Sequence, residues 1–186
     1  FHAATDRRFH AEANCCSRCG PSWELLLPVT SADTSRITPA GMIAAVSDTL
    51  RDGGLVAIKG VGGYHLACSA LHSSAVQRLR SLKRRDARPL ALMMRDLHVI
   101  EQWCELSTDE RDWLASPVAP IVLLRRRRTP CVEVAGDNPY LGVMLPYSPL
   151  HHLLMQQLGE LPLVMTSANV AGEPMLIDDD EASAQL

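Results

Sequence analysis

Hydrophobic residues recur with two different periods along the chain, and these periods predict alternating helices and strands. Three apolar residues lie at helical spacing between the start signal Thr38-Pro39 and the stop signal Gly53-Gly54. Further helices are predicted over residues 73–82, 108–114 and 149–158. Short apolar runs predict strands over residues 55–58, 89–94, 121–124 and 163–165. We therefore expect an α/β (α+β) domain with a mixed, twisted sheet covered by helices.

The periodic pattern is missing from the first part of the chain, which predicts a separate small segment there. Residues 1–27 show neither helical nor strand periodicity, and residues 28–37 are rich in Ser, Thr, Asp and Pro, which is typical of a linker. The main domain is expected over residues 38–186. Because the chain opens with Phe1 and stops just after an acidic stretch, we expect both ends to be cuts in a longer polypeptide.

Composition indicates a globular protein with one principal domain. Of its 186 residues, 47% are hydrophobic and 21% are charged, which excludes a mainly disordered chain. The net charge of -3 gives no general attraction to phosphate backbones, so no nucleic-acid partner is expected. No apolar stretch approaches the roughly 18 residues that span a bilayer, and no signal peptide is recognised. We expect a cytoplasmic protein without a membrane partner.

Cys16 and Cys19 form a CxxC knuckle that is closed by the turn Gly20-Pro21. Two thiolates at this spacing can bind one Zn²⁺, but a closed structural site needs four ligands. The chain contains no second CxxC pair, although His10 or His2 could supply a nitrogen. A surface turn with two thiols and a redox pair remain alternatives.

A glycine-rich loop follows the strand predicted over residues 55–58. Lys59 precedes this loop, and Gly62 and Gly63 would let backbone N–H groups approach an anion closely. The order of residues is not that of a Walker A loop, because no Gly-Lys-Ser/Thr follows. The alternative is a tight turn after the strand.

Six basic residues against the single acid Asp86 give residues 78–88 a local excess of positive charge. Such a density suits a polyanion such as a triphosphate, while the alternative is a solvated helix face. A second basic run, Arg125–Arg128, is expected to be an exposed strand end or loop. The pair His151-His152 is interpreted as polar surface at a helix terminus.

Ser167 and Asn169 follow the last predicted strand. Small hydroxyl and amide side chains at the carboxyl end of a strand are well placed to bind a ligand in an α/β sheet. A capped loop is the alternative.

Seven segments together carry a resemblance to a known family. They are DRRFHAE (6–12), CxxCGP (16–21), AIKGVGGYHLAC (57–68), LKRRDARPLALM (82–93), APIVLL (119–124), GVMLPYSPLHHLL (142–154) and LVMTSANVAGEP (163–174). In this order they resemble the HypF-type hydrogenase-maturation carbamoyltransferases over nearly the whole chain. The first two segments are not expected in stand-alone YrdC proteins, whereas the others are shared with them.

The resemblance implies the end of a zinc-finger region, over residues 1–27, followed by most of a C-terminally truncated, YrdC-like nucleotide-binding domain. Such enzymes use carbamoyl phosphate and ATP to form carbamoyl-adenylate. They then transfer the carbamoyl group to the C-terminal cysteine of a partner protein, for nickel-iron hydrogenase maturation. The YrdC-like domain is implied to form the adenylate, and the fragment alone is expected to be inactive in the full reaction.

The resemblance also implies roles for individual residues. The family's Lys-x-Arg signature matches Lys83 and Arg85, the expected catalytic residues, and its Ser-x-Asn signature matches Ser167 and Asn169. Nucleotide, with Mg²⁺, is expected at Lys59, Gly62, Gly63, Arg88, Ser167 and Asn169, and structural Zn²⁺ at Cys16 and Cys19. Two departures are Asp86, where the family usually has proline, and Arg88, where it usually has lysine.

Two rival functions share parts of this pattern. A threonylcarbamoyl-AMP synthase for tRNA modification has the same Lys-x-Arg and Ser-x-Asn signature, and a double-stranded RNA-binding module would explain the basic run. Residues 1–21 argue against both rivals, because neither includes a zinc-finger segment.

Overall fold

The computed structural model describes residues 22–26, 37–85, 88–169 and 174–185. The CxxC knuckle and almost all of the predicted linker 28–37 lie outside these residues. Within the described part of the chain, no helix has both the length and the apolar character needed to cross a membrane.

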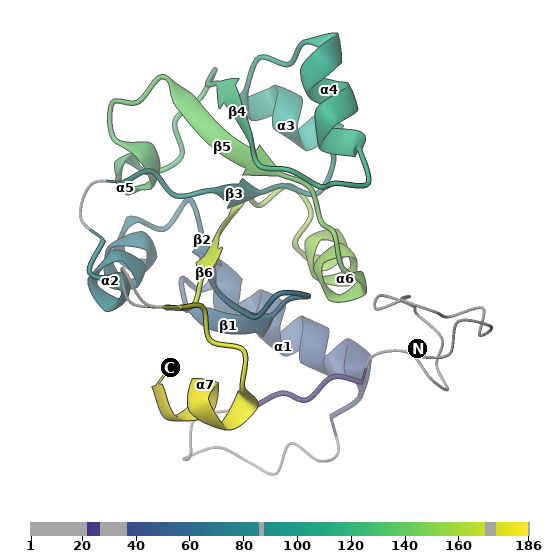
Figure 1. Cartoon of the computed structure of the whole chain (residues 1–186), viewed down its shortest axis with the longest axis vertical. Helices are drawn as coiled ribbons and strands as arrows, with labels where there is room; N and C mark the ends of the chain where they lie inside the picture. The colour runs from purple at the N-terminus through teal and green to yellow at the C-terminus, as the bar shows by residue number, and fades with distance from the viewer. Residues whose placement is uncertain (1–21, 27–36, 86–87, 170–173, 186) are drawn as a thin grey trace, which may run out of the picture.

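Helices and strands alternate along the described chain, as the hydrophobic pattern predicts (Figure 1). The helices are α1 (Pro39–Arg51), α2 (Ser73–Lys83), α3 (Leu97–Trp103), α4 (Thr108–Ala115), α5 (Val132–Ala135), α6 (Pro149–Leu158) and α7 (Asp179–Gln185). The strands are β1 (Val56–Lys59), β2 (Tyr64–Ser69), β3 (Leu92–Met93), β4 (Val122–Arg125), β5 (Tyr140–Met144) and β6 (Leu163–Ser167).

The six strands form one mixed sheet in the order β1-β2-β6-β3-β5-β4. Only β3 and β5 are parallel; the other neighbours are antiparallel. In the register of β2 and β6, His65 pairs with Ser167. In the register of β1 and β2, Lys59 pairs with Tyr64. The end of β1, the start of β2 and the end of β6 therefore lie at one edge of the sheet, where the candidate site is built.

Helices cover both faces of this sheet, so the domain has three layers (Figure 1). On one face, α1 and α6 pack through leucine and methionine side chains such as Leu50, Leu154 and Met155. On the other face, α2, α3, α4 and α5 pack against alternate residues of the same strands, including Leu66 and Val164. Removal of this apolar area from water is the main stabilising contribution to the fold. The expected α/β (α+β) class is confirmed.

The predicted start signal at Thr38 is confirmed, and α4 and α6 begin with similar hydroxyl caps. The Thr38 hydroxyl caps α1 by accepting from the Gly41 N–H at 3.2 Å, and Ser107 forms a capping box with Glu110 at the start of α4. The Ser148 hydroxyl caps α6 by accepting from the His151 N–H at 3.2 Å. The signals of hydroxyl cap and proline therefore locate these helices to within a few residues.

The bounds of the strands are predicted less well than those of the helices. The apolar run 89–94 supplies only a two-residue strand, because β3 is paired only at Leu92 and Met93. The run 121–124 becomes the edge strand β4, which leaves Leu123 67% exposed, so this strand is not buried on both faces. The pattern does not predict β2, β5 or the helices α3, α5 and α7.

Candidate nucleotide site at the sheet edge

Most of the site residues expected from the sequence lie around the edge where β1 ends and β2 begins. Lys59 is the last residue of β1, and Ser167 is the last residue of β6. Lys83, the last residue of α2, reaches this edge from the helix layer. The structure thus brings together segments separated by more than 80 positions in the sequence.

Lys83 joins α2 to the chain that leaves β6. Its side chain is only 3% exposed, and its ammonium donates to the Ser167 carbonyl. It also donates to the backbone carbonyl and to the side-chain Oδ1 of Asn169, both at 3.0 Å. The Ser167 hydroxyl donates to the same Oδ1 at 2.6 Å. Lys83 of the Lys-x-Arg match is therefore in direct contact with both residues of the Ser-x-Asn match. We name Lys83, Ser167 and Asn169 the lysine junction.

Burial is the first cause that lowers the pKa of Lys83, and the Arg85 charge adds to it. The three oxygen acceptors have the opposite effect, because hydrogen bonds to the charged form of a group favour that form. An ammonium has three N–H donors, and each has an acceptor here. Lys83 therefore fixes the turn after β6, and its charge would act on a ligand at this edge mainly through space.

Arg85 lies where the chain turns away from α2. Arg84 ends the helix with a φ of 49° in the left-handed region, and this turn starts the segment that carries Arg85. The Arg85 guanidinium donates to the Pro89 carbonyl at 2.6 Å and, more weakly, to the Arg88 carbonyl at 3.4 Å. Burial, followed by the charges of Arg80 and Arg88, lowers the pKa of Arg85. A cluster of cations this close together suits a polyanionic ligand.

The basic run does not form a uniformly solvated helix face. The Arg80 guanidinium donates to the Glu133 carbonyl at 2.6 Å and to the Arg85 carbonyl at 2.9 Å, so it connects α2 with α5 and with the following turn. Lys83 is buried, whereas Arg84 and Arg88 are exposed. Asp86 lies outside the described residues, so its effect on the cluster stays a prediction.

The glycine loop is the turn of a hairpin between β1 and β2, closed by the Gly60 N–H donating to the Gly63 carbonyl at 2.8 Å. Gly63 has a φ of 140°, and a Cβ there would come within 2.7 Å of the Leu176 carbonyl. Because Gly63 has no side chain, the backbone at Leu176 can pack directly against it. A Cβ on Gly62 would meet no other atom within 4 Å, so the loop is open to an approaching anion at this position.

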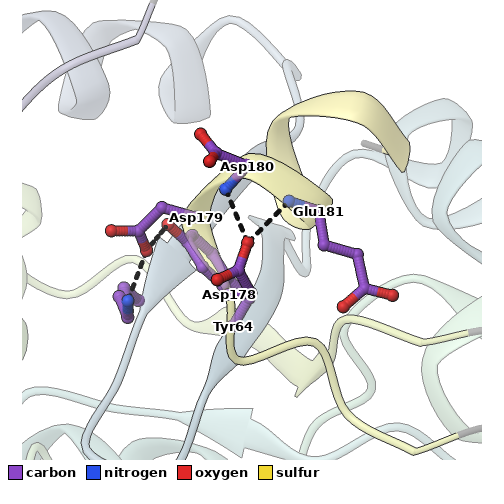
Figure 2. A network of polar contacts seen from close by, with 6 residues as sticks. Tyr64, Asp178, Asp179, Asp180 and Glu181 are labelled. Atoms are coloured by element: carbon purple, nitrogen blue, oxygen red, sulfur yellow. Dashed lines mark hydrogen bonds and ion pairs between the residues drawn. The ribbon is translucent and has the colours of Figure 1, made fainter.

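Lys59 is paired with an acidic side chain that the sequence does not predict as its partner. Its ammonium forms an ion pair with the Asp179 carboxylate, at the start of α7. The Tyr64 hydroxyl donates to the same carboxylate at 2.7 Å, as Figure 2 shows. Burial, and next the hydrogen bond to Asp179, raises the pKa of Tyr64 to about 12. Lys59 therefore meets a carboxylate where the sequence predicted a phosphate or carbamate.

The acidic run that ends the chain provides the geometry of this pair. The Asp178 carboxylate accepts from the backbone N–H groups of Asp180 and Glu181, both at 3.0 Å, and so caps α7 (Figure 2). Acidic residues in a first helical turn are favoured by the helix dipole. This capping preference was the signal in the sequence that could have predicted α7, but it does not predict the contact with Lys59.

The interpretation of His151 as polar surface is wrong. His152 is exposed, but His151 is completely buried between α6 and the sheet. The helical spacing explains this burial. Leu154 and Leu158 follow His151 by three and seven residues, so His151 lies with them on the apolar face of α6.

The zinc and magnesium expectations concern different parts of the chain. Cys16 and Cys19 lie outside the described residues, so the zinc site stays a prediction. Among the described residues, no group of three or more His, Cys, Asp or Glu side chains is arranged to hold a metal ion. The side-chain oxygens of Ser167 and Asn169 beside Lys83 are neutral, so a Mg²⁺ ion here would depend on phosphate oxygens for its charge.

Comparison with known families identifies the class to which the chain belongs. Residues 48–186 match the Sua5–YciO–YrdC family model, which carries the description "Telomere recombination". Residues 1–26 match the model described as "HypF finger". Because the first match covers most of the chain, the chain belongs to the Sua5–YciO–YrdC family.

Individual relatives define the resemblance further. The chain is 42% identical over its whole length to the carbamoyltransferase HypF of Rhodobacter capsulatus, of which it covers 24%. A crystal structure of full-length HypF in a phosphate- and nucleotide-bound form superimposes with a TM-score of 0.83, at 42% identity over 100% of this chain and 24% of that one. Human threonylcarbamoyl-AMP synthase is 30% identical over 74% of this chain and 50% of its own length. The resemblance to HypF-type carbamoyltransferases is confirmed, and the chain spans about a quarter of such a relative.

Proposed function

We propose that this chain is the part of a nickel-iron hydrogenase-maturation carbamoyltransferase that forms carbamoyl-adenylate. A carbamate oxygen, derived from carbamoyl phosphate, attacks the α-phosphorus of ATP. The new P–O bond gives carbamoyl-adenylate, and the bond between the α- and β-phosphates breaks to release pyrophosphate. The thiol of a partner protein's C-terminal cysteine then attacks the carbamoyl carbon, a C–S bond forms and AMP leaves. This reaction takes place in the cytoplasm, where ATP is available.

The observation that carries this proposal is the direct contact between the two signature pairs at the sheet edge. Lys83 holds Ser167 and Asn169 in place, and Arg85 extends from the turn that follows Lys83. Charge increases on the phosphates as pyrophosphate leaves, so cations held in advance of the reaction stabilise the transition state without reorganisation. The nucleotide-bound state of the HypF relative supports nucleotide binding by this fold.

The residues take different roles in this proposal. Arg85 contacts the phosphates, because its guanidinium has N–H groups beyond those that reach the Pro89 and Arg88 carbonyls. Lys83 positions the Ser167–Asn169 turn and adds charge. Arg88 and the open side of the loop at Gly62 complete the phosphate site. Lys59 and Gly63 become secondary candidates, because the first pairs with Asp179 and the second contacts residue 176.

Two metal ions belong to the proposal. Mg²⁺ bound to ATP would shield the charge of the pyrophosphate leaving group, with Ser167 and Asn169 as the nearest oxygen ligands. Zn²⁺ would have a structural role at Cys16 and Cys19, together with ligands from a second CxxC pair. The match of residues 1–26 to the HypF finger supports this assignment.

The rival function is threonylcarbamoyl-AMP synthesis, and the 30% identity to the human synthase favours it as the second candidate. Both reactions activate a carbamate-type oxygen on ATP, so only the acyl substrate separates them. The test is exchange of labelled pyrophosphate into ATP by the complete gene product. We expect exchange with carbamoyl phosphate and none with threonine and bicarbonate. The reverse result would assign the chain to tRNA modification, and no exchange together with salt-sensitive RNA binding would indicate a binding module.

A further inference from the structure

Three ring side chains, of which His151 is buried and the other two are half-buried, form a polar group beside the glycine loop. His65 comes from β2, His151 from α6, and Tyr147 from the segment that leads into α6. The rings of Tyr147 and His151 meet edge-on with centroids 4.5 Å apart, and those of His65 and His151 are 6.4 Å apart. The Tyr147 hydroxyl lies 3.5 Å from Nε2 of His65. We name these three residues the imidazole group.

Most ring nitrogens of this group lack a hydrogen-bond partner among the described residues. His151 is completely buried, and neither Nδ1 nor Nε2 is bonded; Nδ1 of His65 is also buried and unbonded. The Gly63 carbonyl is near His65, but its geometry falls short of a hydrogen bond to Nδ1. Buried polar atoms are almost always paired with protein or with another bound molecule. Three unpaired nitrogens in one place therefore indicate a missing partner.

Burial favours the uncharged form of both imidazoles. Burial, followed by the charges of His65 and His152, lowers the pKa of His151 to about 4. Burial also lowers the pKa of His65, and the charge of Lys83 acts in the same direction. A neutral imidazole offers one N–H donor and one acceptor nitrogen, whereas an imidazolium offers donors only.

The imidazole group borders the proposed nucleotide site. His65 lies directly opposite Ser167 in the sheet. A Cβ on Gly60 would come within 3.0 Å of the His65 ring and 3.3 Å of the Tyr147 hydroxyl, so the loop backbone lies directly against this group. A small molecule at the loop would thus have neutral donors and acceptors on one side. On the other side it would have the lysine junction and Arg85.

We propose that the imidazole group recognises the uncharged end of carbamate, an inference that rests on the proposed function. The amino group of carbamate carries two N–H donors, which match acceptor nitrogens of neutral imidazoles. A carbamate oxygen matches an imidazole N–H or the Tyr147 hydroxyl, while the attacking oxygen faces the phosphates. Phosphate has no N–H donor for these acceptors. The group therefore selects carbamate against a second phosphate in a site that is otherwise cationic.

Two variants of the complete gene product test this inference. Tyr147→Phe removes one hydroxyl, and His151→Leu replaces the unpaired ring by an apolar side chain. In pyrophosphate exchange, we expect the KM for carbamoyl phosphate to rise by roughly tenfold or more. The KM for ATP should stay within about twofold, because the phosphate contacts are intact. His152→Leu, at the exposed neighbour in the same helix, is the matched control and should change neither constant.

Thermal unfolding separates substrate recognition from a purely structural role. Removal of unpaired buried nitrogens should leave the unfolding temperature of His151→Leu unchanged or raise it by about 2–4 °C. A stable variant with a tenfold higher KM for carbamoyl phosphate supports the inference. If the KM for carbamoyl phosphate is unchanged in Tyr147→Phe and in His151→Leu, these nitrogens hold only an internal water. If the KM for carbamoyl phosphate and the KM for ATP rise equally, the substitutions have a general effect on the site. Either result overturns the inference.

The remaining outcomes are also decisive. Should His151→Leu fail to fold, Tyr147→Phe decides alone, since it keeps the ring that packs against His151. Failure of the proposed function appears differently, because the unaltered protein would then show no exchange with carbamoyl phosphate. The inference itself fails when the unaltered protein exchanges normally and Tyr147→Phe leaves the KM for carbamoyl phosphate unchanged.

Discussion

Lys83 and His151 are buried at the same end of the sheet, but their polar atoms have opposite surroundings. Lys83 comes from the α2 face and has three oxygen acceptors, whereas His151 comes from the α6 face and has no hydrogen-bond partner for its ring within the described chain. Burial lowers the pKa of both groups. The acceptors around Lys83 favour its charged form, and the absence of partners favours the neutral form of His151.

This difference divides the edge into a cationic side and an uncharged side. The cationic side suits phosphates, and the uncharged side suits a ligand with N–H donors. Lys59 differs from both residues, because it is exposed and paired with Asp179. Basic side chains that are similar in the sequence therefore have different roles, which are determined by the acceptors around them.

Substitution of Lys83 tests the cationic side most strongly. Lys83→Met keeps the length of the side chain but leaves the carbonyls of Ser167 and Asn169 without their donor. We expect the free energy of unfolding to fall by roughly 1–3 kcal/mol. Pyrophosphate exchange should fall by about three powers of ten or more, because both the charge and the turn are lost. The matched variant Lys59→Met should unfold like the unaltered chain, and equal destabilisation would contradict the proposed difference.

Arg85→Ala should separate charge from structure on the same side. Its guanidinium contacts two carbonyls of the adjacent turn, so its loss should leave thermal unfolding nearly unchanged. Exchange should nevertheless fall by roughly two to three powers of ten, because one charge held near the phosphates is removed. Arg127→Ala, in the second basic run, is the control and should have almost no effect. Similar losses from the two substitutions would mean that overall positive charge, and not this site, promotes the reaction.

The pH dependence of stability tests the uncharged side. The pKa of His151 is about 4 in the folded chain and about 6.5 when unfolded, so the unfolded state binds more protons between these values. Stability should therefore fall as the pH falls through this window, with a loss of roughly 2 kcal/mol from pH 7 to pH 5. Urea unfolding of His151→Leu should show a flatter profile, with His65 responsible for the rest. Identical profiles would show that His151 is not buried as an uncharged group.

Much of the fold could be predicted from the sequence because its signals are local. Thr38-Pro39 and Ser148-Pro149 place a capping hydroxyl before a proline, and the helices begin there. Strand β2 was missed because it begins with the polar residues Tyr64 and His65, which interrupt the apolar pattern. The length of β3 was overestimated, because the hydrophobicity of a segment does not reveal how many of its residues pair with a neighbouring strand.

The candidate site could be predicted only in part. Lys83, Ser167 and Asn169 were predicted to act together, and the structure places them in contact. The partners of Lys59 and His151 could not be predicted, because both depend on long-range contacts. The pairing of Lys59 with Asp179 joins residues 120 positions apart, and no periodicity encodes such a contact.

Asp179→Asn should give the smallest effect and test whether Lys59 belongs to the phosphate site. The substitution removes the carboxylate that competes with an anion for Lys59 and that accepts from Tyr64. The pair is exposed, so we expect the KM for ATP to fall by only roughly two- to fivefold.

In the same variant the pKa of Tyr64 should fall below its present value of about 12, yet stay raised because burial, its first cause, remains. Ultraviolet absorbance titration measures this pKa. Glu181→Gln, in the same acidic turn, is the control, because it keeps the backbone N–H that donates to the Asp178 carboxylate, whereas Asp179 makes the ion pair with Lys59. A lower pKa of Tyr64 with an unchanged KM for ATP would show that Lys59 only anchors α7, and the phosphate site would then consist of the lysine junction, Arg85 and Arg88 alone.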